Sequence, residues 1–135
     1  MLENKIWDSS NSIGIELFDK HHKNFTDIIN MLIDVINKKD CKNKKAEVFH
    51  KLVFYAENYF IDEEMYFKQY NYSKTLQHKD SHSQLIEKIS EFQKNIQDDS
   101  VNCMDMLNYI ELWFNEHMLK YDKDAIDFLS NLGVK

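Results

Sequence analysis

Residues 78–96 read HKDSHSQLIEKISEFQKNI, and their pattern decides the fold. One set of side chains recurs there at spacings of three and four residues: His78, His82, Leu85, Ile89, Phe92 and Ile96. This spacing places the whole set on one face of an α-helix. The stretch therefore predicts a long helix with a largely apolar face, and two histidines lie one turn apart at one end of that face.

Three other segments show the same period. In the first, the residues on the predicted inner face are Phe25, Ile29, Leu32 and Ile36. In the second, roughly residues 45–67, they are Val48, Leu52, Tyr55, Tyr59, Glu63 and Phe67. In the fourth, roughly residues 102–120, they are Met106, Ile110, Trp113 and His117, and Leu107 and Phe114 widen this face. The breaks fall near residues 38–44, 70–74 and 98–102, where Asp98, Asp99 and Ser100 are suitable N-caps for the fourth helix. Four amphipathic segments of about 20 residues predict an all-α fold, an antiparallel up-down-up-down four-helix bundle.

We expect one domain over residues 1–135. It comprises an extended N-terminal arm at residues 1–18, which carries Trp7, and the bundle at residues 19–120. A short C-terminal helix at residues 122–132 is marked by Ile126, Leu129 and Leu132. Composition agrees, because the 135 residues contain no proline and only two glycines. Sandwiches, barrels and βαβ units need more turn residues than this.

Charge and hydropathy make nucleic acid and membranes unfavourable binding partners. The chain has 17 basic residues, all lysine, against 23 acidic ones. Without the arginine fork, sequence-specific nucleic-acid binding is disfavoured. No apolar run approaches the ~18 residues of a membrane span, and residues 1–11 do not resemble a signal peptide, so we expect no membrane partner and a cytoplasmic location. Cys41 and Cys103 follow no pairing motif and are expected to be thiols with a structural or incidental role.

Ionisable residues occupy positions that the helical period assigns to the core: Glu63, His78, His82 and His117. Burying such groups without partners costs several kcal/mol each, and a cation among them would offset that cost. Bundle cores hold metals between facing helices, and histidine with carboxylate suits iron, manganese or zinc. The sequence therefore predicts a metal site.

Each of these residues has an ordinary explanation when it is taken alone. His78 and His82 could be a surface pair, His117 a hydrogen-bonded core histidine, and Glu63 a member of a solvated acidic run. Three helices that direct nitrogen and oxygen ligands inward favour the metal site over three separate coincidences. On the first helix, either His21 or His22 could lie on the inner face. Each continues into apolar residues at helical spacing, His22 into positions 25, 29, 32 and 36 and His21 into positions 25, 28, 32 and 35.

Five separated elements, in this order, resemble the hemerythrin family and specifically its single-domain bacterial members. They are Trp7 with Ile13-Gly14-Ile15; Asp19-Lys20-His21-His22-Lys23; Tyr59-Phe60-Ile61-Asp62-Glu63-Glu64; His78-x-x-x-His82; and Trp113-x-x-x-His117-x-x-x-x-Asp122. The second element is similar to the family's Asp-x-Gln-His-Lys, which selects His22 as the ligand and puts His21 in the usual Gln place. The resemblance covers nearly the whole chain.

The resemblance implies two non-haem iron ions, bridged by carboxylates and by an oxo or hydroxo group. His78, His82 and His117 would hold one iron, His22 would help hold the other, and Glu63 and Asp122 would bridge them. Dioxygen, or a similar small diatomic or peroxide ligand, would bind at the second iron, and an electron donor would reduce the pair. No residue would act as an acid or base, so the resemblance implies oxygen binding in preference to catalysis.

The departure from the family lies at Tyr59, where the second iron's other histidine is expected. His50 cannot substitute, because it lies about 13.5 Å earlier along the axis and on the opposite face, where we expect a surface residue. Tyr59 either coordinates iron as a phenolate, the alternative we favour from sequence, or packs as a core aromatic. A phenolate would stabilise ferric iron, which favours an oxidoreductase acting on peroxide, nitric oxide or ferrous iron over an oxygen carrier, store or sensor.

The step from His117 to Asp122 is five residues, which leaves the two about 140° apart on a regular helix. For both to face the core, we predict a π-type turn or a loosened helix end between them. A third class of function, a metal-free structural bundle, is disfavoured by the buried ligands.

Overall fold

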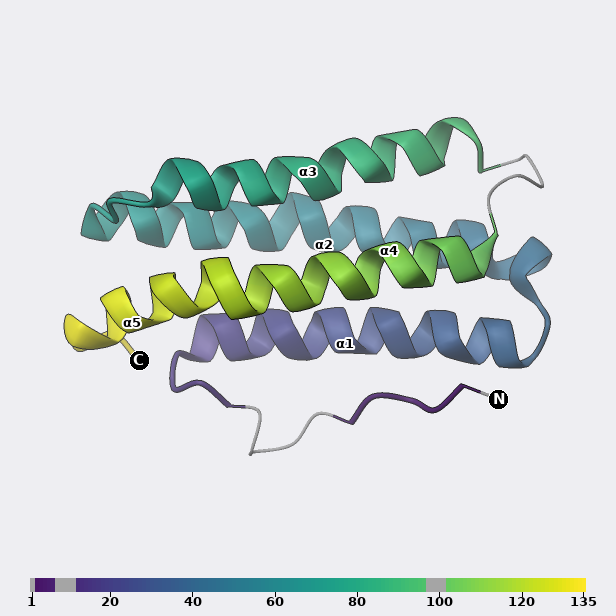
Figure 1. The fold of residues 1–135 in the computed structure, drawn as a ribbon, viewed down its shortest axis with the longest axis horizontal. Coiled ribbons are helices and arrows are strands. Elements are labelled where there is room, and N and C mark those ends of the chain that lie inside the picture. Colours follow the sequence, from purple (N-terminus) through teal and green to yellow (C-terminus); the bar gives the residue numbers. More distant parts are fainter. Residues whose placement is uncertain (1, 7–11, 97–101) are drawn as a thin grey trace.

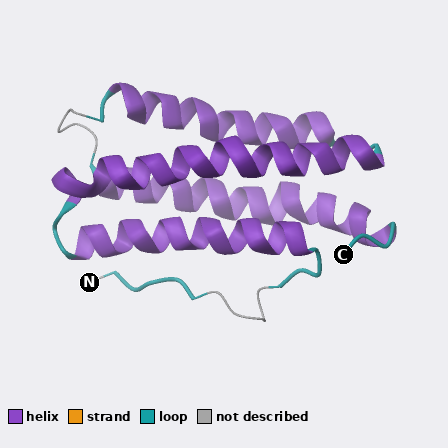
Figure 2. Cartoon of the chain, turned by 180° about the vertical axis from the view of Figure 1, so that it is seen from behind, coloured by secondary structure: helices purple, strands orange, loops and turns teal. Residues whose placement is uncertain are grey.

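Helices make up most of the computed structural model, which describes residues 2–6, 12–96 and 102–135. The elements are α1 (Glu16–Asn37), α2 (Cys41–Tyr70), α3 (Thr75–Lys94), α4 (Cys103–Glu116), the π-helix η2 (His117–Asp122) and α5 (Lys123–Asn131). No strand occurs within those described ranges (Figure 2). The predicted all-α fold is confirmed, and the ribbon shows the four long helices reversing direction one after another to form a bundle (Figure 1).

The N-terminal arm runs back along α1 (Figure 1). Asn37 and Asn30 on α1 accept hydrogen bonds from the backbone N–H groups of Leu2 and Lys5, at 3.0 and 2.6 Å. The arm ends at Ile15 instead of Phe18, because Asp19 accepts a hydrogen bond from the backbone of Ile13 at 2.8 Å and so starts the helix earlier than periodicity indicated. Trp7 lies outside the described residues.

The fourth helix begins at Cys103, and the side chain of Asn102 caps it by accepting a hydrogen bond from Asp105 N at 2.8 Å. The caps proposed at residues 98–100 lie outside the described residues. At the other end, the predicted short C-terminal helix is present as α5 (Lys123–Asn131), and it continues directly from the π-helix. Residues 103–131 form one continuous helical rod, because the π-helix carries the backbone hydrogen bonding from α4 into α5 (Figure 1).

The two cysteines are bonded to each other, which corrects the expectation of free thiols. The disulfide Cys41–Cys103 joins the start of α2 to the start of α4, with the two Cα atoms 5.8 Å apart. Because the cysteines are 62 residues apart and meet only when the bundle forms, no local spacing could indicate the pair.

Two apolar clusters fill the bundle at different depths. The larger contains Phe25, Phe60, Leu85 and Trp113, and the smaller contains Phe18, Phe67 and Ala125. Along the chain, the polar residues predicted to face inward lie between residues of the two clusters: between Phe18 and Phe25, between Phe60 and Phe67, between Tyr72 and Leu85, and between Phe114 and Ala125. The fold therefore provides a single buried polar layer that is enclosed by hydrocarbon at both ends. No described helix is long and apolar enough to cross a membrane.

Candidate metal centre

The polar layer contains seven ionisable side chains, each 3% exposed or less. They are His21 and His22 from α1, Glu63 from α2, His78 and His82 from α3, and His117 and Asp122 from the two ends of the π-helix. The structure thus brings together six of the seven predicted ligands, and it adds His21. Tyr59 is the predicted ligand that it leaves out.

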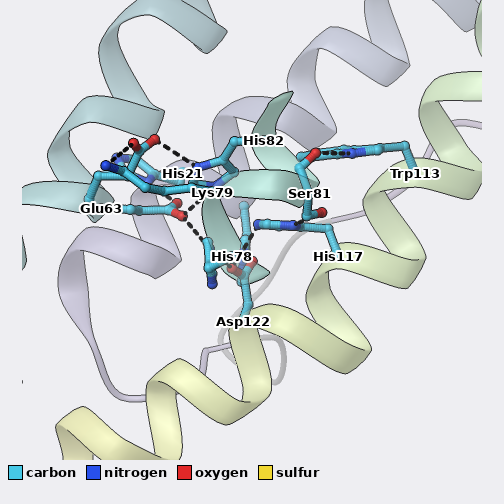
Figure 3. Close-up of polar contacts among 11 residues, drawn as sticks. His21, Glu63, His78, Lys79, Ser81, His82, Trp113, His117 and Asp122 are labelled. Atoms are coloured by element: carbon cyan, nitrogen blue, oxygen red, sulfur yellow. Dashed lines mark hydrogen bonds and ion pairs between the residues drawn. The ribbon is translucent and has the colours of Figure 1, made fainter. Parts of the chain in front are cut away.

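Three histidines face one oxygen of each carboxylate (Figure 3). The Nε2 atom of His78 lies 3.1 Å from Glu63 Oε1 and 3.2 Å from Asp122 Oδ1. His82 Nε2 is 3.1 Å from the same Glu63 oxygen, and His117 Nε2 is 3.0 Å from the same Asp122 oxygen. One ligand atom from each of Glu63, His78, His82 and His117 can be chosen so that all four lie within 4.8 Å of one another, a spacing that could hold one metal ion.

The remaining oxygen of each carboxylate faces α1. His21 Nδ1 lies 2.6 Å from Glu63 Oε2, and His22 Nε2 lies 2.6 Å from Asp122 Oδ2. Each carboxylate therefore divides its two oxygens between two separate groups of histidines. This is the arrangement of a carboxylate that bridges two ions.

Further side chains fix the ring orientations on the three-histidine side. The Nδ1 atom of His82 contacts Glu64 Oε2 at 3.0 Å, and that of His117 contacts Ser81 Oγ at 2.7 Å. Trp113 donates its indole N–H to the backbone carbonyl of Ser81 at 2.9 Å, which holds that turn of α3 in place (Figure 3). Partners of this kind hold the ring nitrogens that face the carboxylates in a fixed direction.

Aromatic rings wall the layer. Phe60 stacks on His82 with the ring centroids 3.8 Å apart, and Trp113 stacks on His117 at 4.6 Å. Phe67 meets His78 edge-on at 4.5 Å. Because these rings exclude water, charges inside the layer interact more strongly than they would at a surface.

The electrostatics of the layer follow from burial and pairing. Burial would raise the pKa of both carboxyl groups, and the charge of Asp122 would raise that of Glu63 further. The surrounding histidines nevertheless hold the pKa of each carboxyl group well below its usual range. Burial would lower the pKa of His78, but Asp122 and Glu63 raise it to about 9. The pKa of His117 is lowered, because burial is the largest effect there. Two ionised carboxylates thus lie in a layer that would also attract a metal cation.

A metal ion fits the unpaired atoms of this layer. Within the described residues, His117 Nε2 and Asp122 Oδ1 are buried and make no hydrogen bond, although they lie 3.0 Å apart. Ligand atoms about 2.1 Å from one ion and at right angles to each other lie about 3 Å apart, which matches the spacings on the three-histidine side. An ion there would satisfy both orphaned atoms.

Tyr59 is directed away from the carboxylates. Its hydroxyl accepts a hydrogen bond from Asn24 at 2.6 Å, and its half-buried ring lies on His21 with centroids 4.5 Å apart. It also lines a cavity of about 280 Å³ that Asn24, Ile28 and Tyr55 share. His50 is exposed, as predicted.

The predicted distortion of the helix is confirmed. Residues 117–122 form a π-helix, and the N–H of Lys123 bonds to the carbonyl of Met118, five residues earlier. His117 and Asp122 can therefore both face the core, at 3% and 1% exposure.

Comparison with known proteins agrees with this geometry. The family described as "Hemerythrin HHE cation binding domain" matches residues 13–129, and the chain belongs to the hemerythrin family. It is 29% identical over 127 residues to a bacteriohemerythrin of Clostridium acetobutylicum, covering 90% of this chain and 98% of that protein. It is also 26% identical over 122 residues to bacteriohemerythrins of Pseudomonas paraeruginosa and Pseudomonas aeruginosa, covering 90% of this chain and 79% of theirs. Membership implies a non-haem di-iron centre, and the buried histidine and glutamate group can bind metal.

Proposed function

We propose that the protein binds dioxygen reversibly at its di-iron centre, as a carrier, a store or the receiving part of a sensor. In this proposal His78, His82 and His117 hold one iron, His22 helps hold the second, and Glu63 and Asp122 bridge the two. The observation that carries the proposal is the division of each carboxylate between two groups of histidines. A bound diferrous pair would supply two electrons to dioxygen on binding and recover them on release, and a separate electron donor would be needed only to reduce a pair that had become ferric without bound dioxygen.

The chain's own residues supply the geometry and the dry surroundings. The aromatic walls and the two apolar clusters exclude water from the layer, and the ring partners Ser81 and Glu64 keep the histidines aimed inward. All seven side chains of the layer are buried, and His78 also lines a cavity of about 280 Å³. The burial favours binding of a small molecule such as dioxygen over turnover of a larger substrate.

The test begins with metal analysis of the protein from its native host, followed by anaerobic reduction and exposure to air. We expect two irons per chain and a visible band that appears with air and disappears when oxygen is removed. His82→Ala should lose iron, whereas the exposed His50→Gln should behave as the wild type. Zinc in place of iron, or steady consumption of peroxide with no reversible band, would contradict the proposal and favour an oxidoreductase.

A cytoplasmic location is a further part of the proposal. The Cys41–Cys103 disulfide is of a kind that is more common in oxidising compartments, so the location is tested by cell fractionation and not by the state of the cysteines. We expect the protein in the cytoplasmic fraction. Recovery in a fraction outside the cytoplasm would contradict this part of the proposal.

A further inference from the structure

His21 is a buried histidine that the proposed ligand set does not use. Its side chain is fully buried on α1, next to the proposed ligand His22. The family resemblance assigns this position to glutamine, and it assigns a histidine to position 59, where this chain has tyrosine. The two departures lie on neighbouring helices, and the rings of His21 and Tyr59 are in contact, with centroids 4.5 Å apart.

The α1 side of the layer repeats the plan of the three-histidine side. There, one oxygen of each carboxylate has two histidine nitrogens at 3.0 to 3.2 Å. On the α1 side, Glu63 Oε2 has His21 Nδ1 at 2.6 Å, and Asp122 Oδ2 has His22 Nε2 at 2.6 Å. Without His21, these groups would offer the second iron only one imidazole. His21 would bring the candidate ligands to two imidazole nitrogens and two carboxylate oxygens.

The use of different ring nitrogens is consistent with two adjacent residues reaching one ion. Side chains at consecutive positions leave a helix about 100° apart, so their rings approach a shared point from different directions. His21 presents its near nitrogen, Nδ1, and His22 presents its far nitrogen, Nε2. The other nitrogen of His21, Nε2, is buried and has no hydrogen-bond partner within the described residues, so within that part of the chain the polar contacts of this ring are all on the Nδ1 side that faces Glu63.

Tyr59 covers this ring instead of reaching the carboxylates. Its hydroxyl is occupied by Asn24 at 2.6 Å, on the side that opens to the surface cavity. We propose that His21 is the second histidine ligand of the second iron, in place of the histidine absent at position 59, and that Tyr59 is the aromatic cover over it. The inference rests on the proposed di-iron centre and names a ligand of that centre.

The assignment changes the chemistry expected of the site. A neutral imidazole in place of a phenolate does not favour ferric over ferrous iron to the same degree, so it leaves the ferrous state accessible for reversible binding. It also predicts that the ferric protein has no tyrosinate-to-iron colour.

The test compares single variants at the two positions. His21→Gln restores the family's residue and can still donate a hydrogen bond to Glu63, but its amide is a poor substitute for imidazole on iron. We expect the His21→Gln variant to bind one iron per chain instead of two, and one of the two iron environments in the Mössbauer spectrum should disappear. Tyr59→Phe should retain both irons and the visible spectrum of the wild type, and the exposed His50→Gln is the control for loss of a histidine.

A double variant keeps the test decisive if His21→Gln is poorly folded. His21→Gln with Tyr59→His should recover both irons, because it returns a histidine to the second iron from α2. Retention of both irons by His21→Gln, or loss of a visible band in Tyr59→Phe, would overturn the assignment and leave Tyr59 as the ligand. A wild-type protein without two irons would instead reject the di-iron proposal itself, so the two failures are distinguishable.

Discussion

His117 and Asp122 lie five residues apart on one continuous helix, and both are buried with Nε2 and Oδ1 3.0 Å apart. A regular α-helix would separate their directions by about 140°. The π-helix between them removes that separation by adding a residue to the turn. The same distortion also sets the direction in which α5 presents Ala125 and Leu129 to the smaller apolar cluster.

Deleting Leu119, which is 74% exposed within the π-helix, leaves His117 and Asp122 four residues apart, a step that separates their directions by only about 40° on a regular α-helix. Both side chains can then face the layer without the π-helix, so we expect the variant to keep its iron. Leu119→Ala, which keeps the five-residue step, is the control, and it should change the free energy of unfolding by no more than about 0.5 kcal/mol. Iron content and thermal unfolding measure both effects. A deletion variant that loses iron would show that the π-helix itself is required.

The second prediction concerns Ser81, whose hydroxyl lies 2.7 Å from His117 Nδ1. Ser81→Ala removes this contact and frees the ring to turn, so we expect iron affinity to fall about 10- to 100-fold. Ser83→Ala, at an exposed position two residues along the same helix, should leave the affinity unchanged. Competition with a chelator of known affinity measures the difference. Equal losses in the two variants would point to a general effect on α3.

Helical period predicted the bundle and four of the polar residues that meet, Glu63, His78, His82 and His117, and the family resemblance added His22 and Asp122. Helical period could not decide between His21 and His22, since the two series diverge by one position and the structure buries both. The direction of the Tyr59 hydroxyl depends on Asn24 from another helix. The disulfide likewise depends on two helix starts that meet only in the folded chain. What sequence missed was therefore set by contacts between helices.

The disulfide provides the third prediction. Closing a loop of 62 residues should stabilise the fold by about 2–4 kcal/mol, so a reductant should lower the melting temperature of the wild type. The Cys41→Ser, Cys103→Ser double variant should melt at the lower temperature with or without reductant. Iron content should not change, because Glu63 lies about 33 Å further along α2 than Cys41. A wild type that is insensitive to reductant would mean that the bond is absent or adds no stability.

The fourth prediction concerns the pH dependence of the metal-free protein. His78 Nε2 lies 3.1 Å from Glu63 and 3.2 Å from Asp122, and the rings of His82 and His117 are each 4.6 Å away. Burial would lower the pKa of His78, but the two carboxylates raise it from 6.5 to about 9. A group whose pKa is higher in the folded state than in the unfolded state stabilises the fold at pH values below its unfolded-state pKa. That stabilisation is lost as the pH rises to the folded-state pKa. The free energy of unfolding should therefore fall by up to about 3 kcal/mol from pH 6.5 to 9.

Metal reverses this dependence, because an ion replaces the proton on His78 Nε2 and needs the neutral ring as its ligand. The iron-loaded protein should keep its stability as pH rises and lose it in acid, where protons compete for the histidines and protonation of Glu63 and Asp122 removes further stability. Urea unfolding of both forms at several pH values measures this difference. The metal-free His78→Gln variant should decline less steeply above neutral pH, since it lacks one titrating ring while His22 and His82, whose pKa values are also raised by the neighbouring carboxylates, remain. If it declines as steeply as the metal-free wild type, another group must hold the proton.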